Sequence, residues 1–131
     1  MVAKTNYLEL KILNHVLRGE VYTPPTAWYV VLFTTDPGEA GDVVNEITTA
    51  ARVAAAFTQA TGTDPFCANV AEVLFDFTAG PVQPTHFGVA DAAASGAGNV
   101  LYRAPLTDSS RIYQTGDQGR FAAGALVITE D

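Results

Sequence analysis

The first 19 residues carry apolar positions at helical spacing. The stripe consists of Leu8, Ile12 and Val16, widened by Leu10, Leu13 and Leu17. Asn6 followed by Glu9 predicts a capping box at the start of the helix, and Gly19 predicts its end. A helix of about three turns with so wide an apolar face is not stable alone. We therefore expect it to dock, either on its own sheet or on a neighbouring chain.

From residue 27 onward, short apolar or alternating runs between turn residues predict strands. The continuous apolar run 28–33 suits a strand buried on both faces. In 70–77 the apolar residues alternate and place Val73, Phe75 and Phe77 on one face. The remaining expected strands are 52–57, which would equally suit a helix, and 86–90, 100–104, 111–114 and 121–129.

This spacing predicts a mainly β fold, an antiparallel β-sandwich or barrel of about six to seven strands with one N-terminal α-helix. A chain of 131 residues suits a single domain, residues 1–131. Within it we expect a docking helix at 1–19 and the β-sandwich at 27–131.

The net charge of the chain limits the classes of molecule that it is expected to bind. Fourteen acidic residues against seven basic ones give a net charge of −7, so we expect no nucleic-acid partner. A polybasic patch and an apolar run of about 18–20 residues are both missing from the sequence, so we expect no membrane partner. We also expect synthesis in the cytoplasm without an export signal. A single cysteine, Cys67, excludes an internal disulfide.

Residues with catalytic or metal-binding chemistry are few. His15 and His86 lie far apart in sequence and in different expected elements, so a metal site is not expected. Cys67 has no local histidine partner and is expected to be a buried, inert thiol. Asp36, Glu39, Asp42 and Glu46 form the densest acidic run, and its order differs from that of a calcium-binding loop. A solvated turn is the expected structure there.

The sequence therefore predicts a protein that acts by binding other proteins, without enzymatic activity, cofactor or metal. Trp28 has two open interpretations, packing on the N-terminal helix or sheet and anchoring an interface. Exposed aromatic side chains could also form a stacking platform for a ligand. The candidate interface residues are Leu8, Ile12, Val16, Trp28, Tyr102 and Tyr113.

Short segments in a fixed order along the chain resemble a known family. They include Leu17-Arg18-Gly19, Tyr22-Thr23-Pro24-Pro25, Tyr29-Val30-Val31-Leu32-Phe33-Thr34, Asn45-Glu46-Ile47, Arg52-Val53, Thr85-His86-Phe87-Gly88-Val89, Asn99-Val100-Leu101-Tyr102 and Gly124-Ala125-Leu126. In this order the chain resembles small virion proteins of tailed phages, labelled tail-fibre or head-decoration-like proteins. It departs from the family at Ala50-Ala51, where a Gly-Tyr is frequent, and at 80–84, where a Trp-Gly is frequent.

The resemblance implies a virion component without enzymatic activity. The favoured expectation is a capsid cement or decoration protein, or the base of a head spike, that binds the major capsid protein on the outer shell. Self-association is expected, with a trimer as one form. The alternative is a tail-tip, baseplate or tail-fibre-associated domain that contacts the host surface or attaches a fibre. A small esterase or glycosidase is the weakest alternative.

Overall fold

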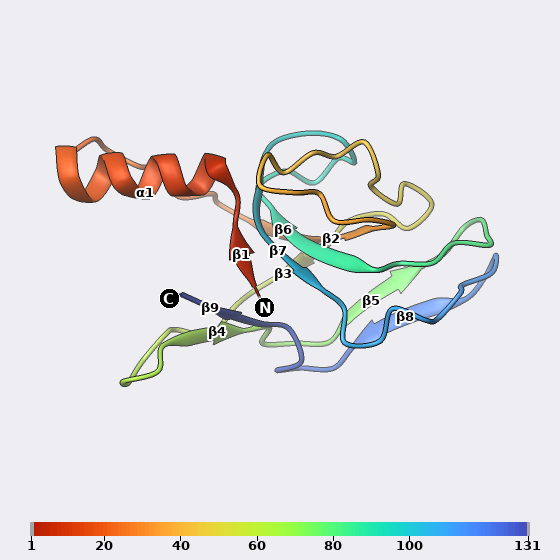
Figure 1. The fold of residues 1–131 in the computed structure, drawn as a ribbon. Coiled ribbons are helices and arrows are strands. Elements are labelled where there is room, and N and C mark those ends of the chain that lie inside the picture. The colour runs from red at the N-terminus through yellow and green to blue at the C-terminus, as the bar shows by residue number, and fades with distance from the viewer. Residues whose placement is uncertain (1, 131) are drawn as a thin grey trace.

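The computed structural model describes residues 2–130 and is mainly β, as the sequence predicts. Two layers of antiparallel strands face each other, and one helix, α1, extends away from them near the N-terminus (Figure 1). The described elements are β1 (Ala3–Lys4), α1 (Asn6–Arg18), β2 (Trp28–Phe33), β3 (Val53–Ala55), β4 (Phe66–Ala68), β5 (Val73–Asp76), β6 (His86–Ala90), β7 (Val100–Pro105), β8 (Gln118–Phe121) and β9 (Val127–Thr129).

One layer is a five-stranded sheet in the order β1-β7-β6-β2-β3. The second layer consists of two antiparallel pairs, β4 with β9 and β5 with β8. β2 and β6 pair along five residues, from Tyr29 opposite Ala90 to Phe33 opposite His86. The architecture confirms the prediction of an antiparallel β-sandwich.

Both faces of β2 are buried, which confirms the prediction from its continuous apolar run. Val30 and Leu32 face the second layer and join the main core. Val31 and Phe33 point to the opposite side, where a smaller cluster with Ala90 and Val100 is covered by the loop that contains Val43. The outer face of the sheet is therefore closed by loops rather than by another sheet.

The start of α1 differs from the predicted capping box. Thr5, not Asn6, is the N-cap residue, and its side chain makes no cap hydrogen bond. Its hydroxyl instead donates to the Val100 carbonyl at 2.5 Å, and its N–H donates to the Leu101 carbonyl at 3.0 Å. Thr5 is fully buried, so β7 fixes where the helix begins. The end is as predicted, because Gly19 takes the left-handed conformation with φ 68°.

The predicted strand 121–129 is wrong, because the chain turns between β8 and β9. Asn69 is the physical reason. Its side-chain amide donates to the Ala122 carbonyl at 2.9 Å and its side-chain oxygen accepts from the Leu126 N–H at 2.9 Å. These bonds hold 122–126 in a turn, in which Gly124 has φ 81°. Phe121, Ala123, Ala125 and Val127 consequently do not share the face of one strand.

Other boundaries differ by less. Val73, Phe75 and Phe77 share one buried face as predicted, but β5 begins only at Val73. The segment 52–57 contains β3, which resolves its ambiguity in favour of a strand. Segment 111–114 contributes only a single bridge between Tyr113 and Val82. The sequence pattern did not predict the short strands β1 and β4, and it predicted only the last residue of β8, Phe121.

Candidate interaction surface

α1 is attached to the body of the protein only at its N-terminal end, where it contacts β1 and β7 (Figure 1). The Asn6 N–H donates to the Glu39 carbonyl at 2.7 Å, and Leu8 is the only helix residue that is classed as buried. The following turns extend away from the sheets. The helix therefore does not cover the body with its apolar face.

Four apolar side chains of α1 are left exposed to solvent. They are Leu10, Leu13, Val16 and Leu17, and we call them the α1 stripe. Their exposed fractions are 59%, 56%, 69% and 76%. At 3.6 residues per turn they fall within an arc of about 120°. Val21, at 90% exposure, continues the apolar surface beyond the helix end. Exposed apolar residues gathered in one arc are typical of surfaces that contact another molecule.

The free end of α1 is held by local bonds rather than by the sheets. The backbone N–H groups of Gly19 and Glu20 both donate to the Asn14 carbonyl. His15 Nδ1 lies 2.8 Å from the Glu20 carbonyl. Arg18 pairs with Glu20 at 3.4 Å on the surface. These bonds give the exposed helix a defined end.

The six candidate interface residues divide between separate places. On α1, Leu8 packs in cis, Ile12 is half-buried and Val16 is exposed. Trp28 and Tyr102 share an apolar pocket of about 310 Å³ between the main sheet and the β4–β9 pair. Cys67 also lines this pocket and is half-buried. Trp28 therefore packs between the two layers of strands rather than on α1, and 37% of its surface stays exposed.

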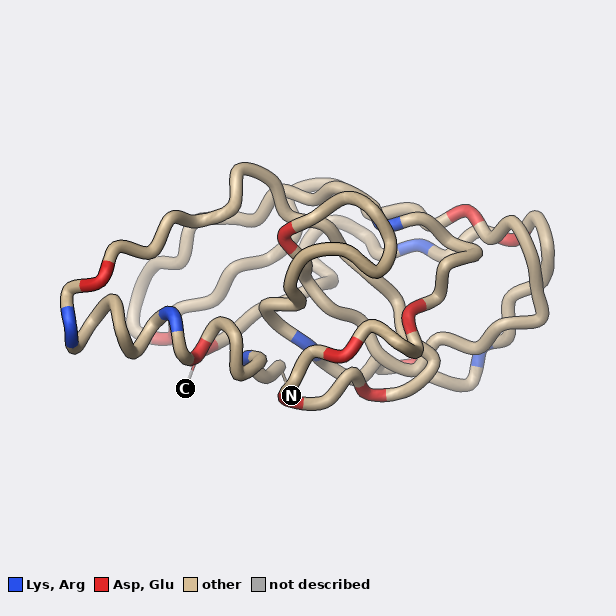
Figure 2. Tube along the Cα trace, turned by 90° about the horizontal axis from the view of Figure 1, so that it is seen from above, with Lys and Arg blue, Asp and Glu red and all other residues tan. Residues whose placement is uncertain are grey.

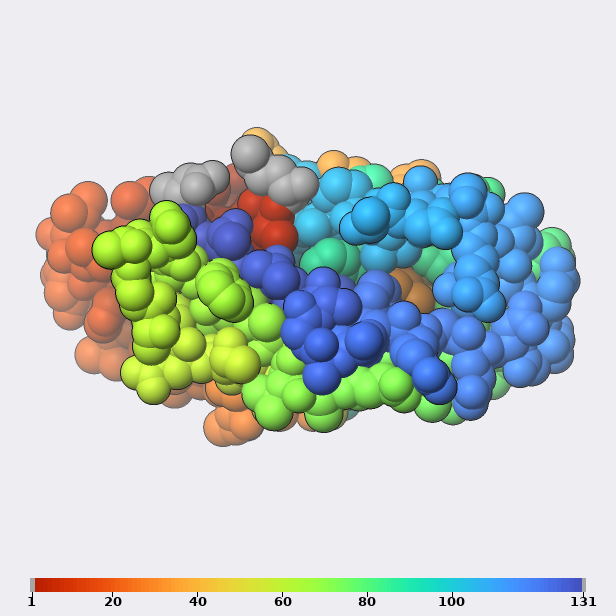
Figure 3. All heavy atoms as spheres, turned by 90° about the horizontal axis from the view of Figure 1, so that it is seen from below, coloured from red at the N-terminus to blue at the C-terminus, as the bar shows by residue number. Residues whose placement is uncertain are grey.

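Tyr113 lies elsewhere and stacks on Phe77, with ring centroids 4.2 Å apart. The Arg111 guanidinium lies 4.8 Å from its ring centroid. Both line a second pocket, of about 350 Å³, whose apolar wall includes Leu32. The space-filling view from below shows a hollow between the C-terminal segments, with an early, orange part of the chain at its floor (Figure 3). The aromatic candidates consequently do not form one stacking platform.

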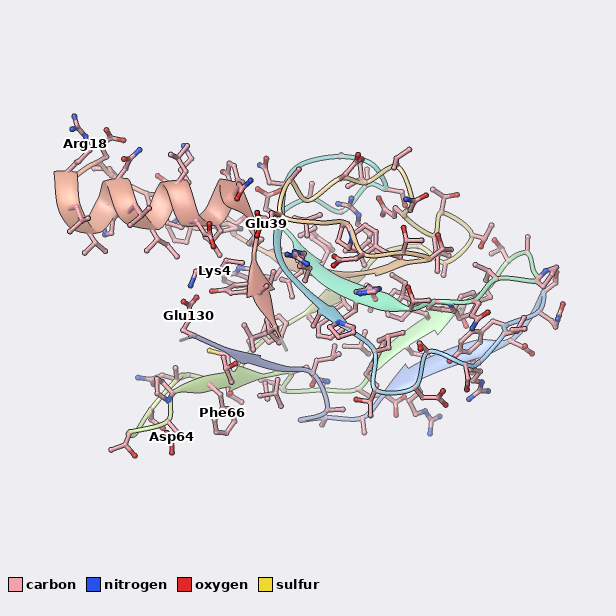
Figure 4. All side chains as sticks on the ribbon, viewed as in Figure 1. Lys4, Arg18, Glu39, Asp64, Phe66 and Glu130 are labelled. Atoms are coloured by element: carbon pink, nitrogen blue, oxygen red, sulfur yellow. The ribbon has the colours of Figure 1, made fainter. Side chains whose placement is uncertain are left out.

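Tyr102 closes the seam between β1 and β9. Its hydroxyl donates to Glu130 Oε1 at 2.6 Å, and Glu130 also pairs with Lys4 (Figure 4). Burial, and then the hydrogen bond to Glu130, raise the pKa of Tyr102 above its usual value of 10.0. The neutral phenol is therefore the form that stabilises this seam.

The raised pKa of Tyr102 predicts a loss of stability in alkali. Because the folded-state pKa lies above the unfolded value, the stabilisation is complete below about pH 10 and is lost as the pH rises further. Tyr102→Phe has no proton to lose and should show a smaller fall in unfolding free energy over the same range. The measurement is urea unfolding at a series of pH values. An identical alkaline fall in both proteins would contradict the assignment.

The acidic run 36–46 is not wholly solvated, so the expectation of a solvated turn is wrong at Glu46. Glu46 and Arg52 form a buried ion pair, at 2.7 and 2.9 Å, with both side chains 1% exposed. Asp36 is at the surface and pairs with Arg103 at 2.8 Å. Burial acts to raise the pKa of Asp36, but the Gly38 N–H and Arg103 outweigh it and the pKa lies below its usual value.

Histidine and cysteine side chains do not converge. His86 Nδ1 lies 2.8 Å from the Thr85 hydroxyl, while His15 lies on α1. Within residues 2–130, no group of three or more His, Cys, Asp or Glu side chains is arranged to hold a metal ion. In the same range, no helix has the length and apolar character needed to cross a bilayer.

The chain forms a β-sandwich that carries an exposed amphipathic helix, and the comparison with protein families identifies it as a component of a phage virion. Residues 3–129 match the family described as podophage GP4 fiber I protein gp80, and the chain belongs to this family. The resemblance to small tailed-phage virion proteins is thereby confirmed. A search of curated proteins found no match.

Proposed function

We propose that this phage virion protein is a non-enzymatic, fibre-associated component that joins the virion through the α1 stripe. The stripe carries the proposal, since four apolar side chains are left uncovered on a helix with a defined end. The word "fiber" in the family description supports the fibre-associated placement. The second candidate position is the outer shell of the capsid, where the protein would act as a decoration protein. The acidic net charge of −7 favours the outer surface over one that faces the packaged DNA.

Charge is distributed unequally between α1 and the rest of the chain. Residues 1–22 contain three basic and two acidic residues, a net charge of +1. Residues 23–131 contain four basic and twelve acidic residues, a net charge of −8. Figure 2 shows acidic positions spread over the body of the protein. A partner that approaches through α1 meets the part of the chain with the least negative charge. This distribution supports α1 as the attachment element.

The attachment role predicts that polar substitutions in the stripe abolish incorporation without unfolding the protein. Leu13→Ser combined with Leu17→Ser should change the unfolding free energy by about 1 kcal/mol or less, because both side chains are already exposed. The amount of protein in purified particles should fall at least about tenfold, which corresponds to 1.4 kcal/mol of lost contact energy. The measurement is quantitative immunoblotting of particles from phage that carry the variant gene.

Ile112→Ser is the matched control, because Ile112 is 54% exposed and lies outside α1. It should leave incorporation unchanged. Normal incorporation of the α1 variant would refute the proposal. Labelling of particles with an antibody against the protein, together with its copy number per particle, tests the position on the virion. A few copies at the tail support the fibre-associated position. Many copies over the head favour the capsid shell.

A further inference from the structure

One hydrogen-bonding edge of β8 is not covered by another strand. Among the described residues β8 pairs with β5 alone, from Gln118 opposite Asp76 to Phe121 opposite Val73. Within residues 2–130, no backbone hydrogen bond joins 118–121 to a segment on the other side. Because alternate residues of a strand turn their N–H and C=O groups to opposite edges, this edge offers donors and acceptors to an added strand.

A groove lies along this open edge. It is the pocket of about 350 Å³ that Tyr113 lines, and we call it the β8 groove. Residues 119–121 form one side and residues 105–108 with Arg111 form the other. Figure 3 shows the hollow among the blue C-terminal segments. The volume is near the lower end of the range for ligand sites, which suits a short peptide segment.

The side chains along β8 define the pattern that an added strand would need. Gly119 is buried and Phe121 packs against the core, whereas the Arg120 side chain lies on the outer face and is 66% exposed. The floor of the groove is apolar, because Leu32 and Phe87 of the core contribute to it. Since strands that pair share their two faces, a matching segment alternates apolar residues toward the floor with polar residues beside Arg120.

Positive charge gathers at the rim of the β8 groove. Residues 23–131 contain four arginines and twelve acidic residues. Arg52 and Arg103 are held in ion pairs away from the groove. The other two, Arg111 and Arg120, both line it. The groove is therefore the part of an acidic body that best accepts a negatively charged segment.

The carboxylates near the rim leave both arginines able to bind a further one. Asp108 accepts from the N–H and the hydroxyl of Ser110, at 3.0 and 2.6 Å. Glu72 pairs with Arg120 at 3.2 Å, but both side chains are exposed and such a pair is weak. Two copies of this chain joined through this edge would bring their arginines together, and like charges disfavour that pairing.

We infer that the β8 groove binds an extended acidic segment of another virion protein, which adds to the open edge of β8 as a further strand. Apolar side chains of the segment contact the floor, and its carboxylates pair with Arg111 and Arg120. Figure 1 shows α1 and β8 at opposite ends of the molecule. The inference therefore does not depend on attachment through the α1 stripe.

A synthetic peptide, acetyl-Thr-Val-Asp-Phe-Asp-Val-Thr-amide, tests the inference against the full-length protein labelled with nitrogen-15. In an NMR titration to about 1 mM peptide, the amide signals of 105–111 and 118–126 should shift. Hydrogen exchange should slow at alternate amides of β8, because they gain partners. No binding, shifts confined to other parts of the chain, or shifts without slowed exchange in β8 would each overturn the inference.

Charge reversal tests the role of the two arginines. The same peptide with lysine at both aspartate positions should bind at least about fivefold more weakly. Arg111→Glu combined with Arg120→Glu should reverse this preference. Lys11→Glu combined with Arg18→Glu makes the same charge change at exposed sites on α1 and should leave the preference as it was. An unreversed preference in the Arg111 and Arg120 variant would contradict the charge pairing.

Obstruction of the groove tests its position. Ala125 is exposed and lines the groove, so Ala125→Trp should weaken binding of the acidic peptide at least about tenfold. Ala123→Trp is the matched control, because Ala123 is exposed in the same turn and is not part of the lining. Equal binding by the two tryptophan variants would place the peptide elsewhere and overturn the inference.

The two proposals fail in different experiments. Leu13→Ser combined with Leu17→Ser should leave peptide binding unchanged, because both residues lie on α1. A protein that does not bind the peptide, while the stripe variant still fails to enter particles, refutes the β8 groove and keeps the attachment role. Peptide binding with normal incorporation of the stripe variant does the reverse.

Discussion

Replacement of Glu46 by alanine is expected to destabilise the protein by about 3–5 kcal/mol, because it leaves Arg52 charged and buried without its carboxylate. The Arg52 side chain is 1% exposed, so water cannot take the place of Glu46. Glu46 also accepts the Gly96 N–H at 2.7 Å. Arg52 itself donates to the carbonyls of Ala92 and Ala97, both at 2.8 Å. One substitution therefore loosens two loops that close the outer face of the sheet.

Urea unfolding followed by circular dichroism measures this loss. Glu72→Ala is the matched control, because Glu72 pairs with Arg120 at 3.2 Å on the surface, with side chains 44% and 66% exposed. An exposed pair contributes about 1 kcal/mol or less. Glu46→Gln keeps the shape but not the charge, and should also cost more than the control. Equal losses for Glu46→Ala and Glu72→Ala would show that the pair is not buried in solution.

Local periodicity predicted the elements in which burial repeats along the chain. β2 was predicted because six consecutive apolar residues need cover on both sides, and β5 because Val73, Phe75 and Phe77 share one face while Glu72, Leu74 and Asp76 share the other. α1 was predicted for the same reason, since its apolar residues return every three or four positions. These patterns express which side of an element avoids water, and that is a local property.

Hydrogen bonds between residues far apart in the sequence fix the turns and element boundaries that periodicity did not predict. The turn between β8 and β9 depends on Asn69, more than 50 residues away, so an alternating apolar pattern was read as one strand. The start of α1 depends on Thr5 bonding to β7. Helical spacing predicted an apolar face on α1, but it left open whether the sheet or a neighbour covers it. The structure buries Leu8 of this face against the body and leaves the four residues of the α1 stripe exposed.

The candidate site shows the same division. Glu46 was read as part of a solvated turn, because charged residues are usually exposed and the loop that covers it comes from residues 92–97. The sequence held one indication that Glu46 and Arg52 have a structural role, because both lie in segments that carried the family resemblance. Trp28, Tyr102 and Tyr113 were grouped by residue type, and only two of them meet in the fold.

Asn69→Leu is expected to destabilise the protein by about 3–5 kcal/mol, since it removes three hydrogen bonds at once without creating a large cavity. The side-chain amide donates to the carbonyls of Ala71 and Ala122, both at 2.9 Å, and the side-chain oxygen accepts from the Leu126 N–H. Asn69 is 1% exposed, so these backbone groups would be left without water. Urea unfolding measures the loss. Asn45→Leu, at an exposed asparagine, should change stability by about 0.5 kcal/mol or less.

Asn69→Asp separates lost hydrogen bonds from lost packing, because the two side chains have the same shape. An ionised carboxylate still accepts from Leu126 but faces the carbonyls of Ala71 and Ala122 with no donor. The protonated form regains one donor, so the pKa of Asp at this position should rise above its unfolded value of about 3.9. The variant should therefore approach the stability of the unmodified protein below that pH and lose stability relative to it as the pH rises. A stability difference that is constant with pH would show that packing, rather than the bonds to the turn, holds Asn69 in place.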